Sequence, residues 1–172
     1  MCRFLIVKSK NEINPESLLK SFALACQKSI APDGESQKDG YGIAWHNGET
    51  WQLKKSLSPI WEEQGSFDSI PDNDLFVVHA RSSGFSKDKD NLDYNQPFID
   101  DSVCFVFNGM IRGVKMKRKL DGKIGSQKLF SLIKKEIKNS SIDNVLSSVK
   151  KIISNSSKNI ESMNMGLIKN GE

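Results

Sequence analysis

Met1-Cys2-Arg3-Phe4 opens the chain, and the apolar residues that continue to Val7 predict a short β-strand entered directly from the N-terminus. Aminopeptidase removal of Met1, which tolerates a small second residue, would leave a thiol and a free α-amine on one carbon. The amine titrates at about 7.7 to 8.0 and the thiol at about 8.5, so a nucleophile and its base would arrive together. The pair would suit nucleophilic catalysis, whereas a small residue that merely opens a strand is the plain alternative.

Length and composition predict one globular domain over residues 1–172. Hydrophobic residues make up 37% of the chain and charged residues 27%, and no apolar run approaches the roughly 20 residues of a membrane helix. Leu5-Ile6-Val7 is followed by Lys8 and is too short for a signal-peptide core. We therefore expect a cytoplasmic protein that does not enter membranes.

Cysteine and histidine are scarce. The three cysteines, Cys2, Cys26 and Cys104, are odd in number and widely spaced, which argues against a disulfide framework. With only His46 and His79 besides, the chain lacks the residues of a zinc site. The sequence implies neither a metal nor an organic cofactor.

The net charge is small, at +4. The densest basic run is Val114-Lys115-Met116-Lys117-Arg118-Lys119, which could contact nucleic acid or an acidic partner. No aromatic residue interleaves with it and the rest of the chain is not strongly basic, which favours a solvated loop. We therefore expect no nucleic-acid partner.

The hydrophobic pattern predicts an α+β fold whose first helix begins at Asn14-Pro15-Glu16. This tripeptide combines a capping side chain, a proline in the first turn and an early acid. The helix would present one apolar face, which makes Cys26 a core residue. The residues of this face are Leu18, Leu19, Phe22, Ala23 and Cys26.

Asn47-Gly48 predicts a hairpin between strands at 41–45 and 50–54, because this dipeptide is the strongest short-range hairpin signal. Asn108-Gly109 is expected to close a later strand, and residues 169–172 look like a hairpin turn whose return strand is absent. Lysines would fill the outward faces of the later helices. The other predicted elements are strands at 75–80, 102–107 and 163–168 and helices at 126–138 and 141–154.

Four separated motifs now stand in order along the chain: Met1-Cys2-Arg3, Asp39-Gly40-Tyr41-Gly42-Ile43-Ala44-Trp45, His79-Ala80-Arg81-Ser82-Ser83-Gly84 and Phe107-Asn108-Gly109. In this order and at these spacings they resemble the class II glutamine amidotransferases, which are N-terminal-nucleophile (Ntn) hydrolases. The closest resemblance is to the small stand-alone branch with bacterial YafJ-like proteins and γ-glutamyl hydrolases of thiol metabolism. Each motif is weak alone and the ordered set is specific.

The resemblance implies a four-layer αββα sandwich, in which two mainly antiparallel sheets pack face to face with helices outside. The C-terminal hairpin of that fold would be truncated here. In the family the terminal cysteine attacks the side-chain amide of glutamine, ammonia leaves, and water hydrolyses the thioester. By resemblance, Cys2 is the nucleophile and its own amine is the base.

The resemblance also assigns the substrate contacts. Arg81 falls where the family holds the substrate α-carboxylate, a task that suits a planar guanidinium, and Ser82 and Ser83 would belong to the same substrate site. The side chain of Asn108 and the backbone N–H of Gly109 fall where the oxyanion hole lies. The plain alternatives are a surface ion pair for the arginine and a simple turn for Asn-Gly.

Three positions depart from the family pattern. Phe107 stands where a histidine usually precedes Asn-Gly, and Gln96-Pro97-Phe98 stands where His-Pro-Phe is common. Gly125 stands where the family has an aspartate for the substrate α-ammonium, and a lost partner of a buried charge costs about 2–5 kcal/mol. Asp121 could substitute, or the substrate could lack a free α-ammonium.

We therefore expect an enzyme whose small-molecule substrate is glutamine or another γ-glutamyl compound. Two alternatives remain open at this stage. The chain could be a non-catalytic ligand-binding or regulatory module on the same fold. It could also be the glutaminase subunit of a split amidotransferase, or a homodimer, because exposed strand edges invite pairing with an ammonia-accepting synthase subunit or a second copy.

Overall fold

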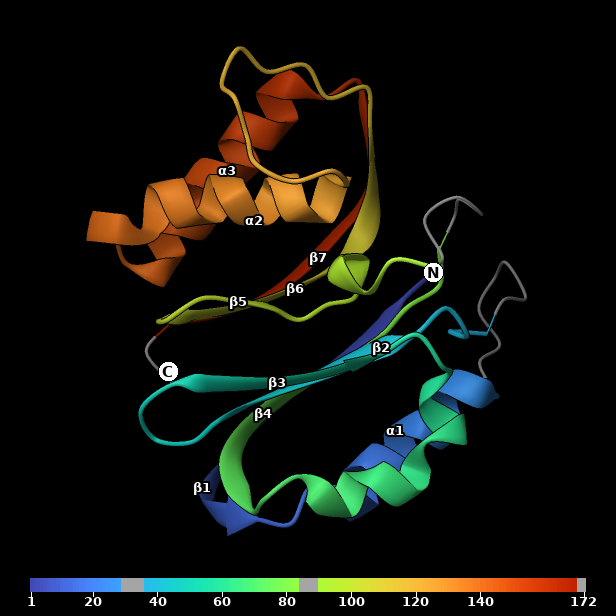
Figure 1. The fold of residues 1–172 in the computed structure, drawn as a ribbon. Helices are drawn as coiled ribbons and strands as arrows, with labels where there is room; N and C mark the ends of the chain where they lie inside the picture. Colours follow the sequence, from blue (N-terminus) through green and yellow to red (C-terminus); the bar gives the residue numbers. More distant parts are fainter. Residues whose placement is uncertain (29–35, 84–89, 170–172) are drawn as a thin grey trace.

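The computed structural model describes residues 1–28, 36–83 and 90–169, arranged as four layers (Figure 1). Four antiparallel strands form the first sheet, in the order β1-β4-β2-β3. These strands are β1 (Arg3–Ile13), β2 (Tyr41–His46), β3 (Trp51–Ser56) and β4 (Asn73–Ala80).

A second antiparallel sheet lies face to face with the first, in the order β5-β6-β7 (Figure 1). Its strands are β5 (Phe98–Ile99), β6 (Val103–Arg112) and β7 (Asn159–Lys169). The long β6–β7 pair runs from Val103↔Lys169 to Arg112↔Asn159.

Helices cover the outer face of each sheet. Below the first sheet lie α1 (Glu16–Gln27) and the 3-10 turns η1 (Ile60–Glu62) and η2 (Gln64–Ser69). Above the second sheet lie α2 (Gly125–Glu136), the 3-10 turn η5 (Ile137–Asn139) and α3 (Ile142–Ser156). A further 3-10 turn, η4 (Leu92–Tyr94), precedes β5. The predicted four-layer αββα sandwich is confirmed.

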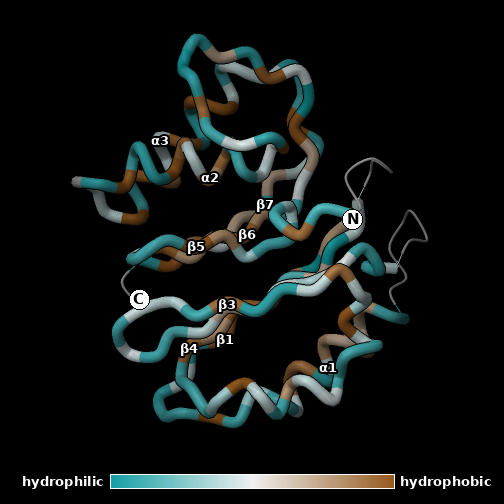
Figure 2. The backbone as a smooth tube through the Cα atoms, in the orientation of Figure 1, coloured by the Kyte–Doolittle hydropathy of each residue, from teal (hydrophilic) through white to brown (hydrophobic). Residues whose placement is uncertain are grey.

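Three apolar layers hold the four structural layers together, and Figure 2 shows hydrophobic residues along the strands of both sheets. Side chains alternate along a strand, so each central strand feeds two layers. On β4, Phe76 and Val78 pack toward α1, whereas Leu75 and Val77 pack between the sheets. Because of this alternation, every second residue along each strand faces the space between the sheets.

Most predicted elements are confirmed. The hairpin forms around Asn47-Gly48, with β2 and β3 paired from Tyr41↔Ser56 to His46↔Trp51. The first helix begins at Glu16, whose N–H donates to Asn14 Oδ1 (3.0 Å). Cys26 is fully buried, as predicted. Most residues of the basic run at 114–119 are exposed, in agreement with a solvated loop.

Two expectations are wrong. Asn108-Gly109 does not close a strand, because β6 continues to Arg112 and pairs with β7 throughout. Leu18 is not a core residue but is 39% exposed, because the buried face of α1 is narrower than its apolar stripe. The predicted C-terminal hairpin turn falls mainly on residues 170–172, which lie outside the described residues.

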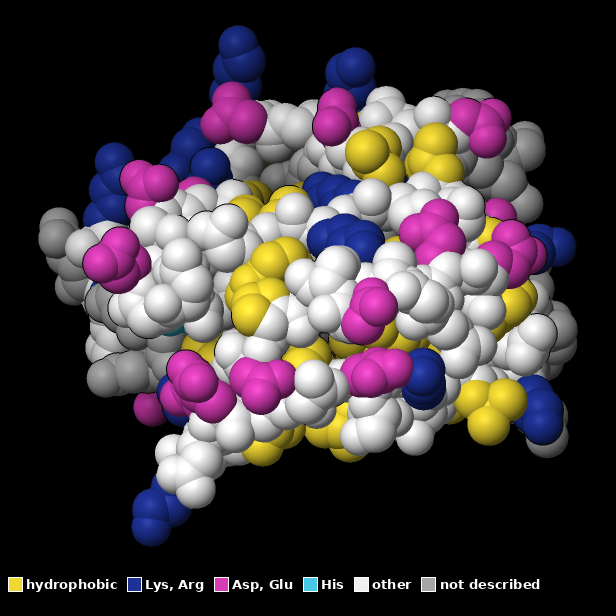
Figure 3. Space-filling model, turned by 60° about the horizontal axis from the view of Figure 1, so that its bottom comes forward, with side chains coloured by type: hydrophobic (Ala, Val, Ile, Leu, Met, Phe, Trp, Pro, Cys, Tyr) yellow, Lys and Arg dark blue, Asp and Glu magenta, His cyan; other side chains and the backbone are white. Residues whose placement is uncertain are grey.

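Charges of both signs are scattered over the face of the molecule that Figure 3 draws. The face seen from below in Figure 3 intersperses acidic, basic and apolar side chains, and its described residues form no continuous basic patch. Within the described parts of the chain, no helix is long and apolar enough to cross a membrane.

Candidate active site

Cys2 lies at the edge of the first sheet, directly before β1 and next to the space between the two sheets. The pairing Arg3↔Ala80 between β1 and β4 sets Cys2 next to Arg81. The backbone N–H of Ser82 donates to Cys2 Sγ (3.4 Å), and the thiol contacts the Ser82 carbonyl oxygen (3.5 Å). The sulfur is therefore fixed against the chain that leaves β4.

The environment of Cys2 favours the neutral thiol. Burial raises the pKa of the Cys2 thiol above its ordinary value and outweighs the Ser82 N–H, the N-terminal ammonium and Arg81, which lower it. Asp39 adds to the upward shift of this pKa. A thiol in this setting needs a base before it can attack a substrate.

Asn108 reaches the same place from the second sheet. Cys104 and Val106 of β6 face the space between the sheets, and strand alternation gives Asn108 the same orientation. Asn164 is its cross-strand neighbour on β7. Cys2, Asn108 and Asn164 line one hollow of about 450 Å³, together with Phe4 and others of β1 and α1. The structure thus brings the predicted nucleophile and the predicted oxyanion-hole side chain together.

Gly109 follows Asn108 inside β6 and pairs with Met163. A Cβ at this position would overlap the carbonyl oxygen of Ser162, so the close approach of β7 requires glycine here. Gly109 is therefore explained by the close approach of β7 and not by the turn expected from the sequence.

Arg81 is 6% exposed, and three side chains hold its guanidinium. Its Nη1 donates to Asn95 Oδ1 (3.3 Å), its Nη2 donates to Ser83 Oγ (3.4 Å), and its guanidinium lies 5.8 Å from the ring centroid of Tyr94. The side chain is therefore oriented before any ligand arrives.

Asp39 lies two residues before β2 and forms hydrogen bonds with Arg81 and Ser83. Its N–H donates to the Arg81 carbonyl (3.0 Å), and its Oδ2 accepts the N–H of Ser83 (2.7 Å). The Arg81 N–H in turn donates to the Gly40 carbonyl (2.8 Å). Ser82 and Ser83 thus lie beside Cys2 and Arg81, and their role at a substrate site stays a prediction. Gly84 of the same motif lies outside the described residues.

Gln96 fixes the strand segment that carries Asn108. Its side chain accepts the N–H of Phe107 (2.6 Å) and donates to the Phe107 carbonyl (3.1 Å). Since Phe98 pairs with Phe105, this side chain continues the β5–β6 ladder where the β5 backbone has turned away. The backbone of Gln96 approaches Gly42 of the first sheet so closely that a Cβ there would overlap it.

The two residues expected near the substrate ammonium lie in different surroundings. Asp121 lies away from Cys2, in a different cavity, where its Oδ2 accepts from Ser131 Oγ (3.2 Å). Gly125 begins α2, and a side chain added there would meet open space. Two residues further on, Gln127 Nε2 donates to the Asp93 carbonyl (3.1 Å), next to the Tyr94 ring that covers Arg81.

The sequence motifs did not assign roles to Asp39, Asn95, Gln96 or Asn164. The role of Asp39 could have been found in the Asp39-Gly40-Tyr41-Gly42 motif, because an aspartate in a turn often accepts hydrogen bonds from backbone N–H groups. The other three depend on contacts between distant segments. Among the described residues, no group of histidine, cysteine and acidic side chains could hold a metal ion.

No protein-family model matches this sequence, and no curated protein matches it either. Solved structures do match its fold. The chain aligns with the glutamine phosphoribosylpyrophosphate amidotransferase of B. subtilis over 99% of its own length and 35% of that chain, with a TM-score of 0.59 and 13% identity. This chain therefore spans about a third of that enzyme.

Two further structures agree. One is described as the allosteric regulatory enzyme of purine biosynthesis, with 99% of this chain and 36% of that chain covered, a TM-score of 0.61 and 15% identity. The other is a glutamine aminotransferase class-II domain protein from Silicibacter pomeroyi, with 77% and 65% covered, a TM-score of 0.55 and 17% identity. The chain has the Ntn-hydrolase fold of these structural neighbours.

Proposed function

We propose that this protein hydrolyses the amide of glutamine or of another γ-glutamyl compound through a thioester on Cys2. The observation that carries the proposal is the convergence of Cys2, the Arg81–Ser83 segment and Asn108 from two different sheets. These groups have the chemistry of a nucleophile, a carboxylate-binding cation and an oxyanion donor.

The chemistry starts after loss of Met1. The freed α-amine of Cys2 takes the thiol proton, which offsets the raised pKa of this buried thiol. The sulfur bonds to the amide carbon, and the side chain of Asn108 and the N–H of Gly109 stabilise the oxyanion. The C–N bond then breaks, and the amine returns the proton to the leaving nitrogen. The α-amine takes a proton from water, which adds to the thioester; the C–S bond breaks, the amine returns the proton to the sulfur, and the γ-carboxylic acid is released.

Arg81 would bind the α-carboxylate of the substrate. Its guanidinium is already oriented by Asn95, Ser83 and Tyr94, so little side-chain entropy is lost when an anion binds. Gly125 offers no carboxylate for an α-ammonium, and Asp121 faces another cavity. This favours a γ-glutamyl compound whose α-amine is blocked or weakly held over free glutamine.

We assign the chain to the small stand-alone YafJ-like type, acting in the cytoplasm as a single domain over residues 1–172. The chain spans about a third of the length of the B. subtilis amidotransferase, and a synthase subunit that accepts the released ammonia is the partner we propose. Pairing of two copies is the other assembly consistent with the open edge of β1.

The test combines intact mass with a diazo-ketone norleucine that mimics glutamine. We expect protein without Met1 to gain one adduct, located on Cys2 by peptide mapping, and Cys2→Ala to gain none. Cys26→Ala is the matched control and should label normally, since the pKa of the buried Cys26 thiol is raised to about 12.

Two results would count against the proposal. Label on any residue other than Cys2 would remove the nucleophile assignment. An unlabelled, processed Cys2 at saturating reagent, with no ammonia or amine released from a panel of γ-glutamyl amides, would favour a ligand-binding module instead.

A further inference from the structure

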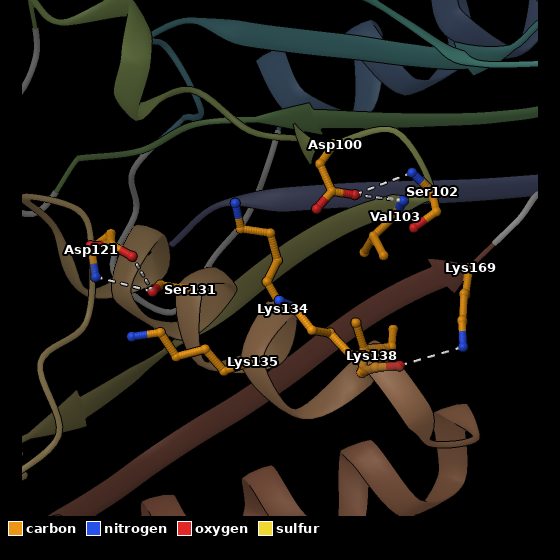
Figure 4. Close-up of a pocket in the computed structure, with 10 residues that line it drawn as sticks. Asp100, Ser102, Val103, Asp121, Ser131, Lys134, Lys135, Lys138 and Lys169 are labelled. Atoms are coloured by element: carbon orange, nitrogen blue, oxygen red, sulfur yellow. Dashed lines mark hydrogen bonds between the residues drawn. The ribbon is translucent and has the colours of Figure 1, made fainter.

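A second hollow, of about 430 Å³, lies on the α2 side of the molecule and does not include Cys2 (Figure 4). It opens between the end of α2, η5, the start of β6 and the end of β7. Its charged lining residues are Lys134, Lys135, Lys138, Lys169, Asp100 and Asp121. Its size falls within the range of about 300–1,000 Å³ that small-molecule sites occupy.

Neutral groups hold three of the four ammonium groups in place. Lys135 Nζ donates to the carbonyl of Lys119 (2.7 Å), and Lys169 Nζ donates to the carbonyls of Ile137 (3.5 Å) and Ser140 (3.3 Å). Lys134 Nζ lies 5.0 Å from the ring centroid of Phe130. These contacts orient the ammonium groups without neutralising their charge.

The two aspartates are engaged elsewhere. Asp100 Oδ1 accepts the N–H groups of Ser102 (3.2 Å) and Val103 (3.0 Å), and Asp121 Oδ2 accepts from Ser131 Oγ (3.2 Å). None of the four lysines forms an ion pair with an acidic residue in the described part of the chain. Four lysines against two aspartates leave a surplus of two positive charges around the hollow.

We infer that this hollow binds a small molecule that carries a phosphate group. A phosphate monoester has a charge near −2 and three strong acceptor oxygens, which matches both the surplus charge and the several ammonium donors. Lys134 extends from α2 into the hollow, so a bound phosphate would contact its ammonium group (Figure 4). Like-charged lysines around one hollow also concentrate anions there before contact.

The experiment is calorimetric titration of the full chain with pyrophosphate and, separately, inorganic phosphate at about 0.15 M salt, where surface attraction is screened beyond about 8 Å. We expect saturable binding of one pyrophosphate per chain. Lys134→Ala/Lys138→Ala should weaken it by about tenfold or more for each lysine that contacts the anion.

The matched control is Lys150→Ala/Lys151→Ala on α3, which removes the same net charge from exposed lysines outside the hollow. It should bind pyrophosphate like the unmodified protein. An equal loss in this control, no saturation by about 10 mM pyrophosphate, or equally tight binding of the dicarboxylate malonate would each overturn the inference. Since the titration requires no turnover, its outcome is independent of the proposed γ-glutamyl chemistry.

Discussion

Acid should destabilise this protein through one residue, His79, before its carboxylates titrate. His79 of β4 is fully buried between the sheets, two residues before Arg81, which follows the end of this strand. Burial, and then the positive charges of Arg81 and Lys55, lower the pKa of His79 from 6.5 to about 3, while contact with the Phe107 backbone opposes the shift. The imidazole is therefore neutral in the folded protein near pH 7.

The sign of the effect follows from the depressed pKa. Below pH 6.5 the unfolded chain binds a proton on His79, whereas the folded chain does so only near pH 3. The free energy of unfolding is therefore highest above pH 6.5 and falls as the pH decreases toward 3. Between pH 7.5 and 5.0 the linkage relation gives a loss of about 2 kcal/mol from this residue.

Urea unfolding at intervals from pH 7.5 to 5.0 measures this loss. His79→Gln should lower the free energy of unfolding at every pH, but the decrease of about 2 kcal/mol across the range should disappear. The chain has only one other histidine, so His46→Gln is the matched control and should retain the decrease. A His79→Gln variant with the same pH dependence as the unmodified protein would refute the reasoning.

Three other predictions concern the contacts around the site. Gln96→Leu leaves the N–H and C=O of Phe107 without their side-chain partner, so urea unfolding should show a loss of about 2–4 kcal/mol, whereas the exposed Gln52→Leu should cost less than about 0.5 kcal/mol. Gly42→Ala should lower the melting temperature because its Cβ would overlap the Gln96 backbone, and an unfolding penalty under about 1 kcal/mol would contradict this, with Gly125→Ala in open space as the control. Gly125→Asp should add about 0.3–1 kcal/mol at the N-terminus of α2 and lower the KM for glutamine; an unchanged KM with intact stability would show that this position does not face the substrate amine.

Local patterns were sufficient to predict most of the fold. The hairpin at Asn47-Gly48, the first helix and the buried strand β4 each depend on residues close in sequence, such as a turn dipeptide or an apolar run. Pairing between strands that are distant in sequence was harder to predict. Asn108-Gly109 has the composition of a turn, but β7 supplies a partner for every residue from Val103 to Met110, and this pairing overrides the turn preference.

The candidate site shows the same division. The positions of Cys2, Arg81 and Asn108 agree with the ordered motifs, and their assigned roles stay predictions. Asn164 and the contacts of Gln96 could not be predicted, because their importance depends on strand register and on side chains that replace backbone partners. Asp121 was a reasonable choice by distance along the chain, but its loop folds back onto Ser131.

The way β1 is held has a practical consequence for recombinant work. Pairing with β4 extends continuously from Arg3 to Lys8 and holds Cys2 at the hollow, so any residues added ahead of Cys2 would start beside this hollow. An affinity tag on that end would keep the nitrogen of Cys2 in a peptide bond, where it cannot act as a base. Purification should therefore use a C-terminal tag, or a protease site whose cleavage leaves cysteine as the first residue.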